Sequence, residues 1–342
     1  MHKVETIVRA GLGTRYTGAV LRVERAGQVV FESAYGALDD GPQARAVEVG
    51  TPFDLASLTK VFVATTALAF VDAGTLQLDM PLRQHLPEWN APPHARITLR
   101  MLLAHTGGLQ SGADYRLLFD EDIERFALLR ELVDEPGRRV IYSDLGFIVL
   151  GTLLARVAGT SLASVVGAQL ALLGCRDTGY RQRNDDPDLV PATEEDAWRG
   201  RVRGAVHDEK AYLMKGVAGH AGLFGTARDV AALSEVYLAA RHGRSTRALE
   251  PSLGREAVTE WGADAVLRRG LGWALKTTNE NSCGSAMSRS TFGHTGFTGT
   301  CCWADPERDL GVVLLTNAVY FGRHDLRDVR AAVCDMCVAE FG

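Results

Sequence analysis

The sequence predicts an α+β protein in which one antiparallel sheet is built from both ends of the chain and flanked by helices, with a mostly helical region inserted between the ends. Strand patterns occur near both termini and apolar residues at helical spacing fill the middle, while 342 residues with 46% hydrophobic content can bury a large core. We assign residues 1–80 plus 265–342 to a sheet domain. Residues 81–264 are assigned to a mostly helical domain with long surface loops, and a cleft between the two is the expected site.

The strands are predicted from β-rich segments that lie beside turn residues. These segments are 18–24, 28–34, 273–277, 299–304 and 310–316. A short Arg-Ala-Gly turn joins the first two into a hairpin, and Pro306 favours a turn between the last two. Residues 325–341 carry apolar side chains at helical spacing and predict a final helix.

The middle of the chain is predicted to be helical because its apolar residues recur at helical spacing. The predicted helices are 61–71, 99–104, 123–133, 145–158, 162–173 and 228–241. The first of them ends before Gly74, a residue that commonly terminates helices. Residues 177–208 are polar and poor in apolar side chains, so we expect a long excursion over the surface.

Composition and charge argue against several classes of partner. The net charge is −5, charged residues make up 23% of the chain and there is no basic block, so neither nucleic acid nor an anionic membrane is expected as a partner. No apolar run approaches the roughly 18 residues of a membrane span, and residues 1–11 lack the apolar core of a signal peptide. We therefore expect a cytoplasmic protein that acts on a small molecule, and make no prediction of its oligomeric state.

The six cysteines, at positions 175, 283, 301, 302, 334 and 337, allow two interpretations. Cys334 and Cys337 have the spacing of half a zinc or redox site, and the adjacent Cys301 and Cys302 would be the other half. The alternative is that Cys334 and Cys337 lie one turn apart on the final helix and pack as small apolar side chains. We favour the alternative, with reduced thiols and no metal.

A nucleophile is suggested where Ser57-Leu-Thr-Lys60 opens the first strong helix. The spacing i, i+3 places Ser57 and Lys60 on one face of that helix, one turn apart. A serine hydroxyl is a weak nucleophile until a neighbour takes its proton, and a lysine ammonium lowers the cost of forming the alkoxide. Only five of the 37 basic residues are lysines, which makes Lys60 notable, but on spacing alone a helix start with a solvated lysine is the simpler interpretation.

Two further segments contain residues that could complete a site. Tyr142-Ser-Asp144 lies just before a predicted helix, where the phenol can point into a cleft. A cation such as Lys60 beside it would favour the phenolate and make Tyr142 a candidate base for Ser57. Gly293-His-Thr-Gly-Phe297 precedes a predicted strand, and its glycines permit a close approach of backbone to a ligand. In isolation, an anchoring tyrosine and a glycine-rich strand with a surface histidine explain the two segments equally well.

Taken in order, these segments resemble the motifs of the serine hydrolase family that contains class C β-lactamases, D-alanyl-D-alanine peptidases and related esterases. That family carries Ser-x-x-Lys, Tyr-x-Asn and Lys-Thr-Gly, and here the three stand as Ser57-Leu-Thr-Lys60, Tyr142-Ser-Asp144 and His294-Thr-Gly296. Residues 102–109 and 218–230 also look like family segments, so the resemblance covers nearly the whole chain. It implies an antiparallel sheet flanked by helices beside an all-helical domain, the fold of serine β-lactamases and penicillin-binding proteins.

The resemblance also implies a role for each matching residue. Ser57 resembles the acylated nucleophile, Lys60 its partner, and Tyr142 the general base that later activates water. The oxyanion hole would consist of the backbone N–H groups of Ser57 and Phe297. The residues expected along the substrate are Asp144, His294, Thr295, Gly296 and Phe297. Acylation followed by hydrolysis needs neither a metal nor a cofactor.

Two positions depart from the family pattern. Asp144 stands where the family has Asn, and its carboxylate would hold Lys60 charged, which favours Tyr142 as the proton acceptor. His294 stands where the family has Lys, and an imidazole is mostly neutral at pH 7 whereas that lysine helps to attract the carboxylate of β-lactams. These departures weaken the case for efficient turnover of penicillins and cephalosporins more than the case for catalysis.

One more segment, residues 206–211 followed by 216–222, resembles a stretch of some β-lactamase-related hydrolases and is expected to form a loop over the cleft. We expect His207 or Asp208 to shape the leaving-group side, with His220 in the same loop. The alternative is a loop that is bonded to itself. His105 is expected to staple a loop rather than to catalyse.

The leading hypothesis is a serine hydrolase that acts through an acyl-Ser57 intermediate on small esters, D-amino-acid-type amides or, weakly, β-lactams. The first alternative is a penicillin-binding or sensor protein that is acylated without turnover, although the presence of both Lys60 and Tyr142 speaks against it. The second is a thiol or zinc site built from Cys301, Cys302, Cys334 and Cys337.

Overall fold

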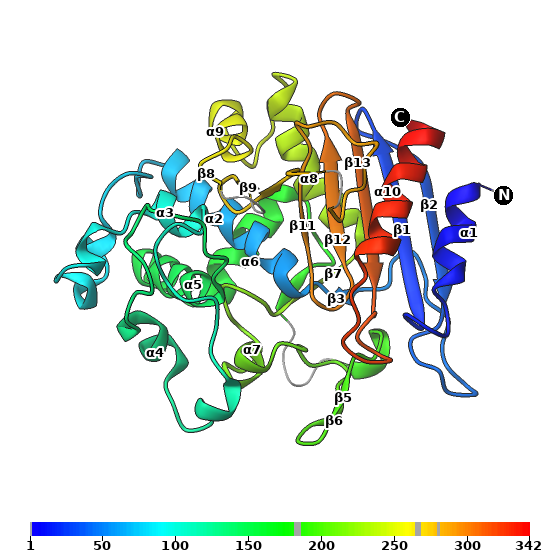
Figure 1. Cartoon of the computed structure of the whole chain (residues 1–342), viewed down its shortest axis with the longest axis horizontal. Helices are drawn as coiled ribbons and strands as arrows, with labels where there is room; N and C mark the ends of the chain where they lie inside the picture. The colour runs from blue at the N-terminus through cyan, green and yellow to red at the C-terminus, as the bar shows by residue number, and fades with distance from the viewer. Residues whose placement is uncertain (1, 181–185, 264–267, 279–280) are drawn as a thin grey trace.

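The computed structural model describes residues 2–180, 186–263, 268–278 and 281–342. Its largest sheet is antiparallel and has eight strands in the order β2-β1-β13-β12-β11-β10-β9-β8. These strands are β1 (Gly18–Arg25), β2 (Gln28–Gly36), β8 (Gly262–Ala263), β9 (Arg268–Arg269), β10 (Ala274–Leu275), β11 (Phe292–Thr295), β12 (Cys301–Asp305) and β13 (Leu310–Thr316). The two ends of the chain meet in this sheet, because β1 pairs with β13 (Figure 1).

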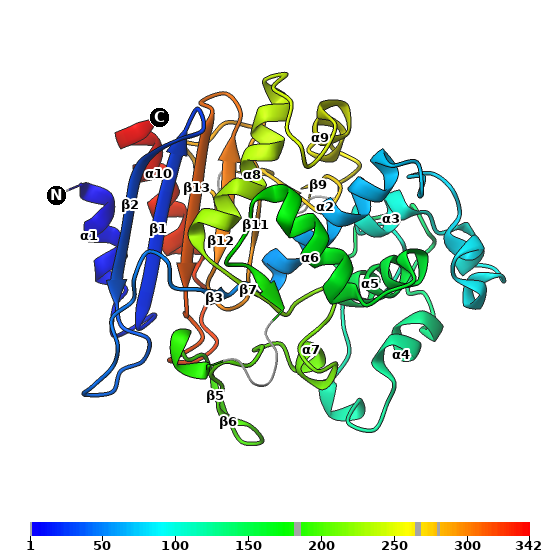
Figure 2. The ribbon, with the colours of Figure 1, turned by 180° about the vertical axis from the view of Figure 1, so that it is seen from behind.

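Helices cover both faces of the sheet. Helices α1 (Lys3–Ala10) and α10 (Arg327–Phe341) pack together on one face, and α8 (Ala227–Arg241) packs on the other against β1, β12 and β13 (Figures 1 and 2). Because both faces are covered, β13 is buried along its whole length and reads as a continuous apolar run. Its side chains alternate between two cores: Val312 joins the core with α1 and α10, and Val313 joins the core with α8.

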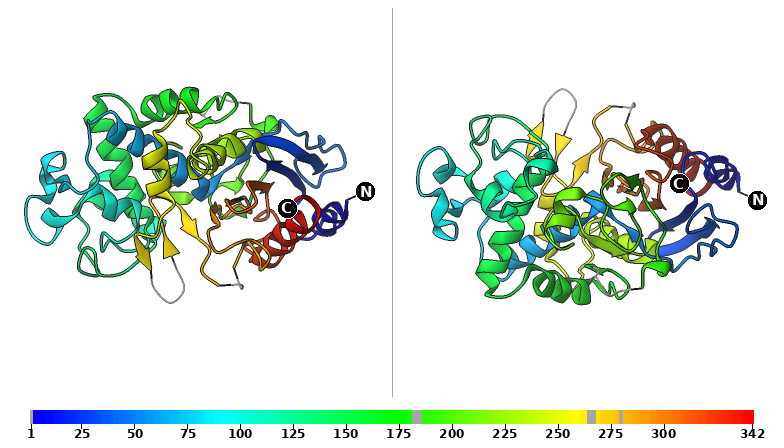
Figure 3. Two further views of the ribbon diagram at one scale, coloured as in Figure 1. Left: turned by 90° about the horizontal axis from the view of Figure 1, so that it is seen from above. Right: turned by 90° about the horizontal axis from the view of Figure 1, so that it is seen from below.

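The helical region lies beside the sheet, at the end away from α1 and α10 (Figure 3). Helices α2 (Thr59–Asp72), α5 (Asp144–Ala158) and α6 (Leu162–Leu173) pack against one another at its centre. The remaining helices are α3 (Leu99–Leu103), α4 (Ile123–Leu129), α7 (Glu209–Leu213) and α9 (Pro251–Ala257). Among the described residues no single helix combines the length and the apolar character of a membrane span; α5 and α6 do so only as a pair, which is bent by 86°.

Two smaller sheets lie outside the main one. The first has three strands in the order β3-β7-β4, and the second is the pair β5-β6. Their strands are β3 (Phe53–Asp54), β4 (Gly179–Tyr180), β5 (Glu195–Asp196), β6 (Gly200–Arg201) and β7 (Leu223–Gly225). The first of them matters for the site, because β3 leads directly into the segment that carries Ser57.

The predicted fold class is confirmed, and the differences are local. Helix α4 ends at Leu129, short of the predicted 123–133, because the N–H of Val133 donates to the carbonyl of Gly108 and the chain turns back there. Helix α8 lies within the segment 81–264 but packs on the sheet. The predicted domain boundary at 264/265 lies outside the described residues and stays a prediction.

The cysteines pack as apolar side chains. All six are free and buried, and Cys334 and Cys337 lie one turn apart on α10, as we favoured. Adjacent residues of a strand point to opposite faces, so Cys301 lies in the core with α10 while Cys302 lies in the core with α8. The four thiols therefore do not converge, and the zinc or thiol site built from them is wrong.

Candidate active site

Ser57 lies in a single 3₁₀ turn, η1 (Ala56–Leu58), between β3 and α2. Ala56, the residue before it, has a positive φ of 46°, a conformation that costs a residue other than glycine roughly 1 kcal/mol or more. The turn is held by two hydrogen bonds: Ala56 N–H donates to Asp54 Oδ1 at 2.8 Å, and Leu58 N–H donates to the carbonyl of Leu55 at 3.0 Å. The backbone strain is thus stored immediately beside the hydroxyl.

Lys60 follows one turn later and is fully buried. Its ammonium lies 2.9 Å from Ser57 Oγ, 3.0 Å from the carbonyl oxygen of His220 and 2.9 Å from Asp144 Oδ1. An ammonium has three N–H donors, and these are three acceptors. Burial alone would lower the pKa of Lys60, but the Asp144 carboxylate and the Tyr142 hydroxyl outweigh it and raise that pKa, so Lys60 is protonated.

Tyr142 comes from the loop that precedes α5. Its ring centroid lies 5.0 Å from Lys60 Nζ and 5.1 Å from the guanidinium carbon of Arg269, so the phenol is between two cations. His105 fixes this loop: its Nδ1 accepts from Ser143 N–H at 3.1 Å and its carbonyl accepts from Ile141 N–H at 2.8 Å. The expectation that His105 staples a loop is confirmed.

Asp144 is the first residue of α5 and points its carboxylate toward α2 and α7. One oxygen lies 2.9 Å from Lys60 Nζ, and the other lies 3.4 Å from the ammonium of Lys210. Burial would raise the pKa of Asp144, but Lys60 foremost, then His220 and Lys210, outweigh it and the pKa is lowered. A carboxylate at this position is therefore ionised and doubly paired.

The segment 294–297 closes the other side of Ser57. His294 is buried on β11, and its Nδ1 lies 2.9 Å from the carbonyl of Thr295. Burial, with Arg269 and Lys60 nearby, holds the pKa of His294 well below its usual value, so the imidazole is neutral at pH 7. It cannot supply the positive charge of the lysine that β-lactamases carry here.

Gly296 is required because the chain passes very close to the Ser57 segment. A Cβ on Gly296 would lie 2.1 Å from Thr300 Oγ1 and 2.6 Å from the carbonyl oxygen of Leu55. The next residue, Phe297, is 57% exposed, and within the described part of the chain its backbone N–H has no hydrogen-bond partner. This N–H is therefore free to bind an oxygen beside Ser57.

A cavity of about 830 Å³ opens over Ser57, Tyr142 and the segment 294–297. Its wall is rich in cations, with Arg268, Arg269, Lys276, Arg323, Arg327 and Arg330 beside the acidic Asp325. Arg330 is buried and donates to the carbonyl of Gly296 at 2.7 Å, and Lys276 donates to the carbonyls of Ser285 and Met287. Arg268, Arg323 and Arg327 are paired with carboxylates, whereas among the described residues neither Arg330 nor Lys276 has a carboxylate within 4 Å. The wall of the cavity therefore carries two cations without a close counter-ion.

The sequence comparisons agree with this geometry. The profile of the family described as Beta-lactamase matches residues 4–334. The chain belongs to the beta-lactamase family. It is accordingly a serine hydrolase.

The relatives and solved structures to which the chain is similar have several different names. An N-acetylmuramyl-L-alanine amidase from Bacillus subtilis (strain 168) is 29% identical over 358 residues, which cover 93% of this chain and 80% of the relative. A protein from Escherichia coli (strain K12), provisionally named a D-alanyl-D-alanine carboxypeptidase, is 30% identical over 345 residues, 88% of this chain and 78% of the relative. The solved structure of EstCE1, a hydrolase with promiscuous acyltransferase activity, has a TM-score of 0.79 at 24% identity and covers 97% of both chains.

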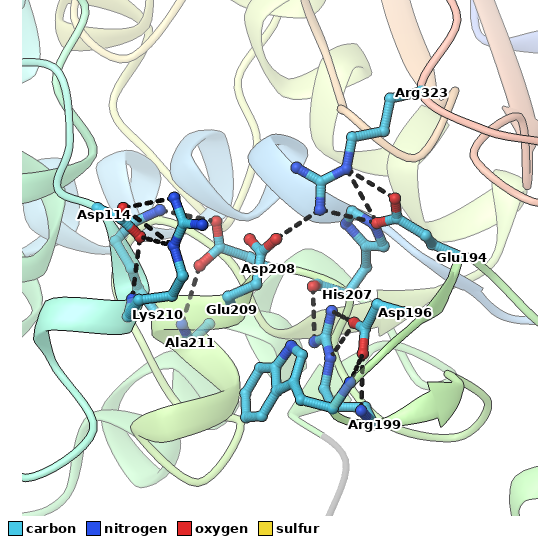
Figure 4. Close-up of polar contacts among 12 residues, drawn as sticks. Asp114, Glu194, Asp196, Arg199, His207, Asp208, Glu209, Lys210, Ala211 and Arg323 are labelled. Atoms are coloured by element: carbon cyan, nitrogen blue, oxygen red, sulfur yellow. Dashed lines mark hydrogen bonds and ion pairs between the residues drawn. The ribbon is translucent and has the colours of Figure 1, made fainter.

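The predicted cleft loop, residues 206–211 and 216–222, contacts the protein around Ser57 and Lys60. His207 N–H donates to Asp54 Oδ2 at 2.7 Å, and its ring stacks on Phe297 at 5.6 Å. Its Nε2 lies 2.8 Å from Glu194 (Figure 4). Glu194 is in turn bound by Arg323 (Figure 4). His207 is connected to the cavity wall by its contact with Phe297 and through Glu194 to Arg323, and its role on the leaving-group side stays a prediction.

Asp208 and His220 are bonded to the protein itself. Asp208 caps α7 by accepting from Ala211 N–H at 2.9 Å, and its carboxylate lies 2.8 Å from His220 Nε2 and 3.1 Å from Lys210 Nζ. Burial would raise the pKa of Asp208, but His220 and Lys210 outweigh it and hold that pKa well below its usual range. His220 contributes its carbonyl oxygen, rather than its ring, to Lys60.

Several residues of the site were not among the predicted ones: Asp54, Lys210, Arg269 and Arg330. Lys210 carried a signal, because it is one of five lysines and follows His207-Asp208 in a segment already singled out. Asp54 lies three residues before Ser57, but its role depends on the N–H of the distant His207, and Arg269 and Arg330 lie outside the motifs and are brought to the site by the fold.

Proposed function

We propose that this serine hydrolase cleaves D-amino-acid-type amides and related small esters that carry a carboxylate, through an acyl-Ser57 intermediate. The observation that carries the proposal is the buried ammonium of Lys60, shared between Ser57 Oγ and Asp144 at 2.9 Å each. A permanent cation at this distance stabilises the serine alkoxide, and the two cations without a close counter-ion in the cavity wall favour an anionic substrate.

The hydrogen bonds around Lys60 support Tyr142 as the base. All three N–H bonds of the ammonium face acceptors, so Lys60 has no lone pair with which to take the proton of Ser57. In the proposed course, the Tyr142 phenolate accepts that proton while Ser57 Oγ bonds to the substrate carbonyl carbon. Tyr142 then returns the proton to the leaving amine or alkoxide as its bond to carbon breaks. In the second step Tyr142 takes a proton from a water molecule as the water oxygen bonds to the acyl carbon, and returns it to Ser57 Oγ as the bond between Oγ and that carbon breaks, which releases the acid.

The oxyanion of each tetrahedral intermediate would be bound by the backbone N–H groups of Ser57 and Phe297. The unpartnered N–H of Phe297 supports this, because a donor that is already engaged would have to break a bond first. Removing one such donor typically costs roughly 2.7–4 kcal/mol of transition-state stabilisation.

The charges in the cavity support a substrate with a carboxylate over a neutral one. Among the described residues no carboxylate lies within 4 Å of Arg330 or Lys276, and a buried cation without a close counter-ion is costly unless a ligand anion provides one. The names of the two relatives, an N-acetylmuramyl-L-alanine amidase and a D-alanyl-D-alanine carboxypeptidase, both refer to amide bonds, and the second supports a D-amino-acid-type substrate. A neutral His294 and an anionic Asp144 argue that β-lactams are turned over only weakly.

A comparison of substrates with matched charges tests the proposal. Rates are measured for p-nitrophenyl esters, nitrocefin, an N-acylated D-alanyl-D-alanine peptide and the same peptide as its C-terminal amide. We expect the carboxylate peptide to exceed its amide by at least tenfold in kcat/KM, with no activity in Ser57→Ala. Arg330→Met should reduce that ratio about tenfold or more, because a hydrogen bond to a charged group contributes roughly 1.5–3 kcal/mol.

Covalent labelling gives the second readout. A fluorophosphonate should add its mass to the peptide that contains Ser57, and Tyr142→Phe should slow this labelling by about 10²–10⁴-fold. Label on another residue would refute the acyl-Ser57 intermediate. A burst of one equivalent without steady turnover on every substrate would instead support an acylated binding protein.

A further inference from the structure

A second lysine is buried beside the catalytic groups. Lys210, on α7, is only 8% exposed, and its ammonium lies 3.1 Å from Asp208 Oδ2 and 3.4 Å from Asp144 Oδ2. The other oxygen of Asp144 lies 2.9 Å from Lys60. The Asp144 carboxylate is thus placed between two ammonium groups, one on each oxygen.

The charges of this cluster balance. Lys60 and Lys210 supply two positive charges, and Asp144 and Asp208 supply two negative ones. Other charged or titratable groups lie on the elements that pack against this cluster. They are Asp54 on β3, Glu209 on α7, His220 in the segment after α7, and His105, His294 and Arg269 around Tyr142. Glu209 is turned away and is bound by Arg323 (Figure 4).

We propose that Lys210 is a positioning residue for acylation: its ammonium neutralises Asp144, so that the charge of Lys60 remains available to stabilise the anions that form on Ser57 and Tyr142. This inference rests on the proposed acyl-Ser57 mechanism. Without Lys210, Lys60 would be the one ammonium beside the Asp144 and Asp208 carboxylates, with the His220 ring as the remaining partner of Asp208, and a further negative charge beside Lys60 would be disfavoured. The pair Asp144–Lys210 has no net charge, like the Asn amide that stands in the family motif at this position.

The inference predicts opposite effects for the two partners. Lys210→Met leaves the cluster with one excess negative charge, which makes the Tyr142 phenolate harder to form. The limb of the pH–rate profile on which activity rises with pH should therefore move about one unit higher. Asp144→Asn leaves one excess positive charge and should move the same limb lower. Lys210→Met/Asp144→Asn restores the balance and should return the limb to its wild-type position.

The experiment measures the rate of fluorophosphonate labelling of Ser57 between about pH 5 and 9 for the wild type and these three variants. At pH 6 we expect Lys210→Met to be slower than wild type by roughly tenfold or more, and the double variant to recover most of this loss. Lys210→Arg, which keeps the charge, should retain a wild-type profile. Lys215→Met makes the same change at an exposed lysine five residues away and should leave both rate and profile unchanged.

A purely structural role for Lys210 gives a different result. If Lys210 only holds α7 against α5, Ser57 in the double variant will be labelled no faster than in Lys210→Met, and the rising limb of the pH–rate profile will not move in any variant. That result overturns the inference. If Lys210→Met does not fold, Asp144→Asn tests the inference by itself. The inference is then overturned if the rising limb of the pH–rate profile of Asp144→Asn stays in place or moves to higher pH. Failure of the proposed function is distinguishable, because then Ser57 itself remains unlabelled in the wild type.

Discussion

Gly296 lies where the strand segment after His294 passes closest to the nucleophile, and a single methyl group there should disable the oxyanion hole. A Cβ would lie 2.1 Å from Thr300 Oγ1, 2.6 Å from the carbonyl oxygen of Leu55 and 3.3 Å from Ala56 Cβ. Two of these partners are in the backbone-anchored turn before Ser57 and cannot rotate away. The segment that carries the N–H of Phe297 must therefore move outward.

The expected magnitude follows from what is displaced. Overpacking of this kind costs typically 1–3 kcal/mol of folding free energy. Loss of one oxyanion donor costs roughly 10²–10³ in kcat, or 2.7–4 kcal/mol. Gly296→Ala should thus lower kcat by about two orders of magnitude, with a much smaller change in KM, because the donor acts on the oxyanion rather than on the bound substrate.

The assay is steady-state hydrolysis of an activated ester, together with the rate of fluorophosphonate labelling and a thermal unfolding curve. Gly167→Ala is the matched control: a Cβ at this exposed position in α6 meets nothing within 4 Å. That variant should keep full activity and gain about 0.5–1 kcal/mol, because alanine favours a helix over glycine. A Gly296→Ala enzyme that folds and keeps kcat within threefold of wild type would refute the reasoning.

Three further predictions concern stability and reactivity. The hydrogen bond from His207, with that of Arg323, holds the pKa of Glu194 at about 2. The stabilising effect of the ionised Glu194 is complete above about pH 4.5 and is lost as the pH falls toward 2. Glu194→Gln should therefore lower the free energy of unfolding at pH 7 by about 1–2 kcal/mol and leave it unchanged at pH 2. Equal losses at the two pH values would contradict this prediction. The carboxylate of Asp54 accepts hydrogen bonds from the N–H groups of Ala56 and His207, so in Asp54→Asn one of these N–H groups faces the NH₂ of the amide. This variant should lose about 1–3 kcal/mol of unfolding free energy in chemical denaturation, and the fluorophosphonate should label Ser57 at least tenfold more slowly. The six buried thiols should react with a thiol reagent only after unfolding, and fast labelling of the native protein would show that one is accessible.

Local patterns predicted the parts of the site that lie within one element. The i, i+3 spacing of Ser57 and Lys60 places the ammonium 2.9 Å from the hydroxyl, because both side chains leave the same face of the helical start. The position of Tyr142 just before a helix likewise predicts a fixed phenol, since the helix start anchors the loop. Sequence periodicity also predicted the long helices and the strands that pair over several residues.

The features that were missed depend on contacts between distant segments. Strands β8, β9 and β10 have two residues each, too few for an alternating pattern to be recognised. Helix α1 has only eight residues of mixed polarity and packs on α10, which is more than 300 residues further along the chain. Lys210 and Arg330 were missed for the same reason, because the groups that give them a role come from other elements.

The strain at Ala56 is explained by the contacts that surround the nucleophile. Both oxygens of Asp54 accept N–H groups, one from Ala56 and one from His207, so the turn before Ser57 and the loop behind the cleft share a buried anchor. From the opposite side, Thr298 Oγ1 donates to the carbonyl of Asp54, which fixes the segment of the proposed oxyanion hole to the same anchor. A backbone conformation that alanine avoids can persist only where the surrounding structure leaves no alternative. These contacts place the hydroxyl and the N–H of Phe297 relative to each other before any substrate arrives, so that little reorganisation is needed when negative charge develops between them.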